Sequence, residues 1–428
     1  MEEKETRAFI VLSDTHLGLR EFKRLHFFKN TVAPRPTHVD HFVKWLEKLQ
    51  KEGEIDLPIA TEELHDDGEY EIKKIGCRKL LCPDTLVLNG DIFELWDASD
   101  QSILFASHSI LNSISRLTCE KIYLIGNHDF ANAQLATGEE GKVTVSSNLF
   151  PWGLSDLNIF RNTYPTPKDG KIRTLRIGED HYLLIHGHQF FSSVPWEIIS
   201  FIRDGAEAFR LYSWVLVGLW MIWIGSLALT AYLEPGISPS IQYGIGFPLT
   251  ILAFPRIFVS IARPIWNKFF GSRYDRKKAP RRFVTWWKKF TKKNELEEKR
   301  IHILYGHTHA IDIVGKSELE KMVNNNIEKI DLTLINHPAW VKDSKSKHKN
   351  ELQEVFVYVD KYGFEFFGWS WDSNSPFHIP KSVVRTYVSG QKIDNETADL
   401  LNALHWPKKL IDELKVSGSK SKRRNISK

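Results

Sequence analysis

Short apolar runs that end in polar residues alternate with amphipathic helical patterns along most of the chain. Runs of Ile, Leu and Val closed by a polar group are typical of buried strands in a parallel sheet. Helices are predicted between them, at 41–51 and around 103–117, because apolar residues recur there on one face. An α/β fold is therefore expected. The predicted strands are 9–14, 84–91, 121–129, 181–188, 301–309 and 331–338, with an antiparallel pair at 354–360 and 364–369.

One region breaks this pattern. Residues 211–233 form an apolar run without a charged side chain, and a second apolar stretch covers 237–254. About 20 apolar helical residues span a bilayer core of about 30 Å, so the region predicts a membrane-embedded hairpin. The alternative is a hairpin buried inside a helical subdomain. The following residues, 268–300, are rich in Lys and Arg with Trp286 and Trp287 among them, a mixture typical of contact with an anionic membrane surface.

The hairpin and the basic run together predict the location of the protein. The segments before and after the insertion must build one sheet, so both ends of the insertion lie on the same side of a membrane. Basic residues next to a span favour the cytoplasmic side. We therefore expect a membrane-associated protein with a cytoplasmic catalytic domain. The predicted domains are 1–200 and 299–385 for the two parts of the catalytic domain, 201–298 for the insertion, and 386–428 for a C-terminal helix and a disordered basic tail.

Composition excludes some classes of protein. The chain has 428 residues, a net charge of +5 and an ordinary content of charged residues, so wholesale disorder is excluded. Three cysteines cannot form a secreted disulfide framework, which favours a reducing compartment. The acidic start has no apolar stretch of signal-peptide length, so no cleaved leader is expected.

Residues able to bind metal ions stand at the ends of the predicted strands. The carboxyl ends of strands in an open α/β sheet line one crevice, so these groups are expected to converge. In an extended chain, residues two apart point to the same side, so both members of a D-x-H or H-x-H pair can reach one centre. The residues concerned are Asp14, His16, Asp91, Asn127, His128, Asp129, His186, His188, His307 and His309.

The types of these side chains predict which ions they bind. Carboxylate, imidazole and amide groups without a thiolate suit Mn²⁺, Fe²⁺ or Zn²⁺ and argue against a structural zinc site. If seven of these side chains are ligands, they exceed the need of one ion. Two ions that share a bridging carboxylate would use all seven. Two such ions clamp a phosphoryl displacement and activate a water. A lone D-x-H or G-D has a structural alternative, the capping of a helix, but all the motifs in this order favour catalysis.

The order DTHLG, GDIFELW, GNHD, HGH and GHTH resembles the calcineurin-like metallophosphoesterase superfamily over residues 8–190 and 300–345. The resemblance implies a four-layer αββα metallophosphoesterase sandwich, here with a helical, hydrophobic insertion. It implies a catalytic His128, oriented by Asp129, as proton donor or charge stabiliser, with His188 behind the ligands or facing the substrate. It also implies a dinuclear centre with one ion on Asp14, His16 and His309, the other on Asn127, His186 and His307, and Asp91 bridging.

The second motif, GDIFELW, is most similar to that of the UDP-2,3-diacylglucosamine pyrophosphatase branch, which has a lipid-contacting lid in the interval of the apolar insertion. The implied activity is hydrolysis of a phosphodiester or pyrophosphate bond in a lipid-linked or nucleotide substrate at the membrane. Two divalent ions are the expected cofactors, with Mn²⁺ favoured and Fe²⁺ or Zn²⁺ as alternatives. The expected partners are this substrate and the membrane rather than nucleic acid. That branch usually has Arg at the position of His128, which leaves the substrate open.

Two other interpretations remain. The motifs DTHLG and GNHD also occur in metal-dependent DNA nucleases of double-strand-break repair, and the basic residues 277–293 could contact phosphates. The uncharged run between the motifs has no use on DNA. A non-enzymatic scaffold that keeps the fold is the third interpretation. Because every ligand position is filled, the sequence favours an enzyme.

Overall fold

The computed structural model divides into two compact units, residues 1–190 with 274–428 and residues 191–273. All described residues belong to the first unit. The apolar run 211–254, Asn127 and His188 lie outside them, and the predicted domain boundaries stay predictions. The described residues are 4–17, 20–25, 28–34, 39–65, 69–93, 110–126, 128–129, 142–145, 157–160, 163–164, 175–187, 280–285, 287, 300–323, 331–340, 352, 354–370 and 372–416.

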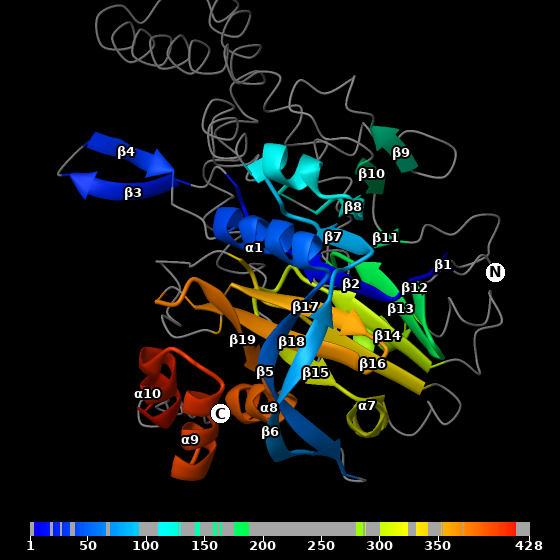
Figure 1. The fold of residues 1–428 in the computed structure, drawn as a ribbon, viewed down its shortest axis with the longest axis vertical. Helices are drawn as coiled ribbons and strands as arrows, with labels where there is room; N and C mark the ends of the chain where they lie inside the picture. Colours follow the sequence, from blue (N-terminus) through cyan, green and yellow to red (C-terminus); the bar gives the residue numbers. More distant parts are fainter. Residues whose placement is uncertain are drawn as a thin grey trace, which may run out of the picture. The chain divides into compact units, whose positions relative to one another are not determined.

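An eight-stranded sheet contains the first three predicted strands and the predicted antiparallel pair (Figure 1). Its middle strands are parallel to one another and buried along their whole length, as the apolar runs predict. The strand order is β19 (Ser375–Ile379), β18 (Gly363–Ser370), β17 (Val355–Asp360), β2 (Ala8–Leu12), β7 (Thr85–Asn89), β8 (Glu120–Leu124), β10 (Leu157–Phe160) and β9 (Lys142–Val145).

A seven-stranded sheet contains the other three predicted strands, which pair in parallel. Two of them, neighbours in the sheet, come from before and after residues 191–273, so that unit is inserted between adjacent strands. The order is β1 (Lys4–Glu5), β12 (Leu175–Ile177), β13 (Asp180–Ile185), β14 (Arg300–Tyr305), β16 (Asp331–Asn336) and β15 (Asp312–Val314), with β11 (Thr163–Tyr164) beside β13.

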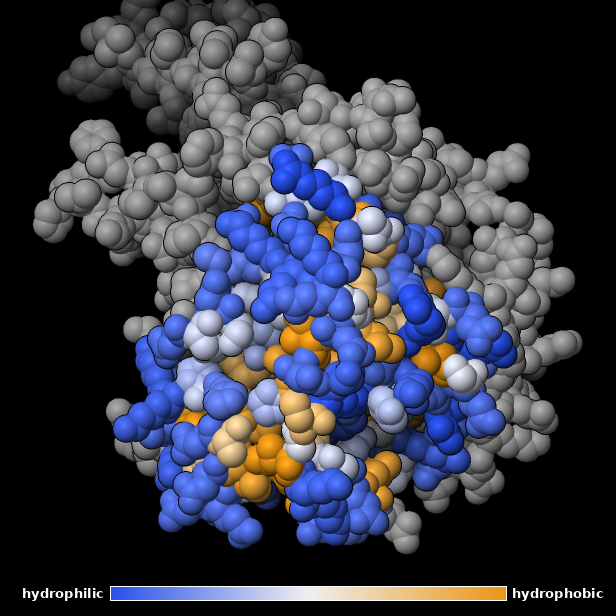
Figure 2. Space-filling model, viewed as in Figure 1, coloured by the Kyte–Doolittle hydropathy of each residue, from blue (hydrophilic) through white to orange (hydrophobic). Residues whose placement is uncertain are grey.

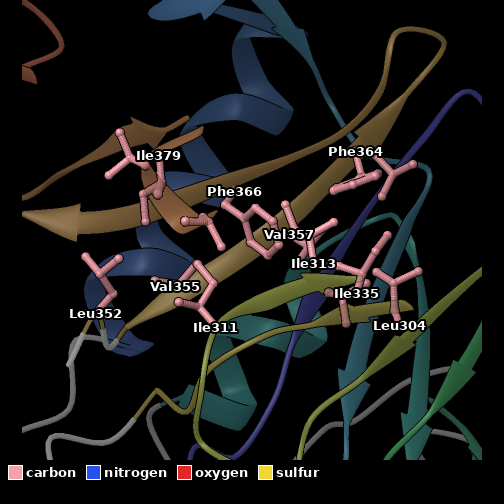
Figure 3. Close-up of a cluster of buried hydrophobic side chains, with 14 of the residues drawn as sticks. Leu304, Ile311, Ile313, Ile335, Leu352, Val355, Val357, Phe364, Phe366 and Ile379 are labelled. Atoms are coloured by element: carbon pink, nitrogen blue, oxygen red, sulfur yellow. The ribbon is translucent and has the colours of Figure 1, made fainter. Parts of the chain in front are cut away.

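The two sheets share one hydrophobic core. The ring of Phe9 on β2 meets that of Tyr182 on β13 edge to face, with centroids 5.2 Å apart. Figure 3 shows Val357 and Phe366 of the eight-stranded sheet with Ile335 of the seven-stranded sheet in this cluster. Fully burying a side chain of this size contributes about 1.5–3 kcal/mol, so the core holds the two sheets in a fixed relation.

Helix α1 (Val39–Glu52) covers the other face of the eight-stranded sheet. Its buried residues recur at helical spacing, and Phe42 packs with ring centroids 5.0 Å from both Phe356 and Trp340. A second helical segment, 110–116, joins the same cluster. On the seven-stranded sheet, α7 (Lys316–Val323) contacts β16. The chain is therefore a mixed α/β protein. The complete four-layer sandwich and the hydrophobic insertion stay predictions.

Two ribbons and three C-terminal helices complete the described residues. The ribbon of β5 (Glu54–Leu64) and β6 (Tyr70–Leu81) crosses the end of the eight-stranded sheet, where Glu62 accepts hydrogen bonds from the first backbone N–H groups of α8. Figure 2 shows a mainly hydrophilic surface on this side, with smaller apolar areas. The remaining elements are β3 (Arg20–Leu25), β4 (Phe28–Pro34), α8 (Lys381–Ser389), α9 (Asn395–Ala403) and α10 (Lys408–Val416).

The predicted membrane-associated location is contradicted by the structure. Across the described ranges, no helix is both long enough and apolar enough to span a bilayer. Helix α1 has 14 residues, a length of about 21 Å, and carries charged side chains. Trp287, expected at a membrane surface, is fully buried, and neighbouring Phe283 packs with its ring centroid 4.6 Å from that of Tyr305. This part of the basic run packs within the unit of residues 1–190 and 274–428, and the prediction of a membrane-bound protein is corrected accordingly.

Candidate metal centre

Both sheets contribute candidate ligands at the carboxyl ends of their parallel strands. Asp14 and His16 follow β2, and Asp91 follows β7. Across the core, His186 follows β13, and His307 and His309 follow β14. The parallel register of β2 with β7, and of β13 with β14, brings these ends together within each sheet. The centre is therefore assembled across the boundary between the two sheets.

The structure brings these side chains into two groups, Asp14 with His16 and His309, and Asp91 with His186 and His307. Within each group the ligand atoms all lie within 4.8 Å of one another. These groups contain the residues that the resemblance implies for the two ion sites, with two differences. Asp91, expected to bridge both ions, is grouped with His186 and His307 only, and Asn127 is not among the described residues. Their role as ligands stays a prediction.

The first group has the donor geometry of a cation site. The Nε2 atoms of His16 and His309 face each other at 3.2 Å, and Asp14 Oδ1 lies 3.4 Å from His309 Nε2. Within the described part of the chain, this fully buried carboxylate oxygen accepts no well-aligned hydrogen bond. Three atoms with lone pairs thus point at one place, as a divalent ion requires.

The second group has the same pattern of burial as the first, with two buried residues and one that is partly exposed. Asp91 Oδ2 is 3.2 Å from His186 Nε2, and both residues are almost completely buried. The rings of His186 and His307 are 5.4 Å apart between centroids. His307 is partly exposed, as is His309.

The electrostatics of the two groups favour positive charge. Burial alone would raise the pKa of Asp14 and of Asp91, but the surrounding histidines outweigh it and hold both pKa values well below their usual range. Burial likewise opposes protonation of His186, yet the charge of Asp91 raises its pKa to about 10. A pocket that stabilises a proton this strongly also suits a metal cation.

The backbone at the ligands is strained. Among the described candidate ligands, all except His186 have positive φ, with 51° at Asp14, 50° at Asp91 and 70° at His307. Residues other than glycine rarely adopt this left-handed region, and such outliers gather at functional sites. For Asp14 with His16, and for His307 with His309, the expectation of an extended chain was wrong: β2 ends at Leu12 and β14 at Tyr305, and all four residues are left-handed.

Close approach of the loops requires glycine at two positions. A Cβ on Gly90, whose φ is +81°, would lie 2.5 Å from Cγ of His186. A Cβ on Gly126 would lie 2.8 Å from Cγ of Asp91. Heavy atoms do not approach this closely, so any larger residue would displace a candidate ligand.

His128 stands beside the first group. Its backbone N–H donates to Asp91 Oδ1 at 2.7 Å, and its ring lies edge-on to that of His16, with centroids 4.6 Å apart. It is half-buried. The imidazole of His128 is therefore close to the first group of candidate ligands, but it is a member of neither group.

Asp129 is buried behind this turn. Its carboxylate accepts hydrogen bonds from the backbone of Ile92 at 2.9 Å and Gly126 at 2.5 Å, and from the hydroxyl of Tyr123 at 2.5 Å. Burial and the charge of Asp91 raise its pKa to about 7. Asp129 thus joins the loop of Asp91 to that of His128, and any orienting effect on His128 acts through these loops.

The sequence interpretation did not identify the buried polar residues beneath the centre. Asn89, the last residue of β7, and His337, just after β16, are both fully buried and joined by a hydrogen bond of 2.9 Å. Burial lowers the pKa of His337 to about 4, so its ring is neutral. A polar residue directly before the Gly-Asp of the second motif was the available signal.

Comparison with known proteins adds little. No protein-family model matches the chain, and no curated protein matches its sequence. A solved structure with some similarity is that of a dimetal phosphatase from Danio rerio, with 10% identity and a TM-score of 0.33, over 84% of this chain and 94% of that one. A similarity this low carries no argument about fold or function, so the conclusions below depend on the residues themselves.

Proposed function

We propose that the protein is a metal-dependent phosphoester hydrolase with a dinuclear centre. The observation that carries the proposal is the pair of adjacent Asp/His groups, drawn from four strand ends on two sheets and surrounded by a field that favours cations. Asp14, His16 and His309 would hold one ion, and Asp91, His186 and His307 the other. Mn²⁺ is the proposed ion, with Fe²⁺ or Zn²⁺ as alternatives that suit the same donors. When bound, two such ions neutralise phosphoryl oxygens and lower the pKa of a water.

The residues of the chain supply positioning and proton transfer. The half-buried His128 lies next to the first group and is held through its backbone by Asp91. Its imidazole N–H can donate to a phosphoryl or leaving-group oxygen bound there, which stabilises the negative charge that develops. Asp129 and Tyr123 keep the turn that carries His128 in place.

The proposed bond is a phosphodiester or a pyrophosphate in a nucleotide or lipid-linked substrate. Support for this class comes from the second motif, whose Asp91–Phe93 part is described, and from the resemblance it carries. The DNA nuclease alternative depends on the basic run 277–293, and there Phe283, Val284 and Trp287 are buried in the catalytic unit. Arg281 and Arg282 are exposed in the same segment, so the nuclease stays the alternative, and the linear DNA in the assay tests it.

The test uses the full chain, stripped with a chelator and reloaded with Mn²⁺. Hydrolysis of bis-p-nitrophenyl phosphate, p-nitrophenyl phosphate, a nucleoside diphosphate sugar, a lipid-linked nucleoside diphosphate and linear DNA is measured alongside bound metal. His128→Ala is expected to lower kcat about 10²–10⁴-fold while both ions remain bound. Asp91→Asn is expected to lose metal and activity together. His65→Ala, in the exposed ribbon, is the control and should change neither.

Two results would contradict the proposal. A wild-type chain that binds no divalent ions would remove the centre. Hydrolysis that persists equally in the chelated protein and in Asp91→Asn would show that the activity arises elsewhere.

A further inference from the structure

A buried asparagine lies directly beneath the second ligand group. Asn89 is fully buried, and its side-chain Nδ2 donates to the carbonyl of Ile185 at 3.2 Å and to His337 Nε2 at 2.9 Å. Its backbone carbonyl accepts from His186 Nδ1 at 2.9 Å and from the hydroxyl of Ser13 at 2.8 Å. Both N–H groups of the amide are therefore used.

These partners connect the two sheets at the boundary where the metal centre is assembled. Asn89 ends β7 and Ser13 follows β2, both strands of the eight-stranded sheet, whereas Ile185 ends β13 and His337 follows β16 in the seven-stranded sheet. Apolar packing holds the rest of the interface, and such packing is not directional. Hydrogen bonds are directional, so Asn89 can fix the offset between the two sheets at this point.

The network reaches every member of the second group and is one or two residues from each. Asn89 precedes Asp91 by two residues, and Ile185 directly precedes His186. The backbone N–H of His337 donates to the carbonyl of Tyr305 at 3.0 Å, two residues before His307. Hydrogen bonds also lead towards the first group, from Ser13 to Asp14 and from Asn336, the neighbour of His337, to Thr308, which precedes His309. These bonds use neither the side-chain amide of Asn89 nor the ring of His337, so replacing those two side chains leaves them in place.

The same bonds select the form of the His186 ring. Because Nδ1 donates to the Asn89 carbonyl, Nε2 is the nitrogen that turns towards Asp91, at 3.2 Å. A metal ligand needs this arrangement, with one ring nitrogen bound to a fixed acceptor and the other directed at the ion.

We propose that Asn89 and His337 are positioning residues for one ion of the proposed dinuclear centre, the ion held by Asp91, His186 and His307. This inference depends on the proposed function. It predicts a selective effect on metal binding. Removing the network weakens binding of the ion held by the second group and leaves the ion on Asp14, His16 and His309 in place. Loss of partners behind metal ligands typically lowers metal affinity 10- to 100-fold.

The test is a Mn²⁺ titration of the full chain, followed by calorimetry and by electron paramagnetic resonance. Wild-type protein is expected to bind two ions and show an exchange-coupled spectrum. Leucine is similar to asparagine in volume but has no hydrogen-bond donor. Asn89→Leu is expected to keep the Mn²⁺ affinity of the first group and to weaken that of the second group 10- to 100-fold. At one equivalent its spectrum should be that of an isolated Mn²⁺ ion. Thr85→Val, at the opposite end of β7, is the control and should resemble wild type.

A second pair of variants keeps the test valid if Asn89→Leu does not fold. His337→Leu removes the acceptor and should reproduce the selective loss. His337→Gln offers an amide oxygen to the Asn89 donor and should restore at least part of the second affinity. A general destabilisation of the sheet would not be reversed by this conservative change.

Three outcomes would overturn the inference. If the Asn89 and His337 variants bind both ions with wild-type affinity, the network does not position the centre. If the Mn²⁺ affinities of the two groups fall equally, the network supports the whole centre, and the predicted selective loss of one ion is wrong. If wild-type protein itself binds fewer than two ions, the proposed function fails first, and the inference fails with it.

Discussion

The close approach of Gly90 to His186 provides a controlled perturbation of the centre. Gly90 has φ +81°, and a Cβ there would lie 2.5 Å from Cγ of His186. Gly53 has nearly the same backbone conformation, φ +76°, but a Cβ there would meet nothing within 4 Å. Replacing each with alanine therefore imposes the same backbone strain, and only Gly90→Ala also displaces a candidate ligand.

The structure allows the two effects to be separated in size. A left-handed conformation costs an alanine roughly 1–2 kcal/mol relative to glycine, which applies to both variants. At about 2–4 °C per kcal/mol, Gly53→Ala should lower Tm by a few degrees. Gly90→Ala should lose in addition the hydrogen bond from His186 Nδ1 to the Asn89 carbonyl, about 1–3 kcal/mol more because that bond is buried.

The assay measures thermal unfolding without metal and then Mn²⁺ binding. Gly53→Ala should bind both ions as wild type does, despite its lower Tm. Gly90→Ala should lose the ion of the second group and the hydrolytic activity with it. If Gly90→Ala binds both ions normally, or if both variants lose metal to the same degree, the steric explanation is wrong.

Two further predictions concern stability. Burial opposes ionisation of Glu365, but the positive charge of Lys381, with His378 and Arg78, lowers its pKa from 4.5 to about 2. The ionised carboxylate therefore stabilises the folded protein fully above about pH 4.5, and this stabilisation is lost as the pH falls towards 2. Glu365→Gln should cost about 3 kcal/mol at pH 7 in chemical unfolding, and a gap from wild type that stays constant between pH 7 and 3 would refute this. Trp287→Ala should cost about 3–5 kcal/mol, because the side chain is fully buried. An unchanged unfolding midpoint would show that this segment does not pack into the unit of residues 1–190 and 274–428.

Strand positions were predictable because buried strands have an apolar sequence pattern that can be identified directly. The runs that became β2, β7, β13 and β14 are mainly apolar, and all their residues are buried except the first of β13 and of β14, since both faces of each strand are covered. The convergence of Asp14 with His309 followed from a general rule about strand ends, without knowledge of the loops.

The loops themselves were not predictable in this way. Left-handed conformations at Asp14, His16 and Asp91 have no local sequence signature beyond the tolerance of Asp and His for that region. The bond from Asn89 to His337 joins residues 248 positions apart, so no local pattern could reveal it. Trp287 was assigned to a membrane surface because its neighbours are basic, but burial depends on tertiary packing, which composition does not record.

The strained turns explain why the positioning network lies where it does. A residue other than glycine relaxes from the left-handed conformation to one of lower energy unless the surrounding contacts prevent it. Asp91 and His307 are such residues, and each stands two positions beyond a residue in the hydrogen-bonded network, Asn89 or Tyr305. His186, which alone among the described candidate ligands lacks positive φ, is bound to that network through its own ring. The buried polar bonds therefore occupy the points from which the backbone of the second group would otherwise relax, and a metal ion held there would depend on residues that do not touch it.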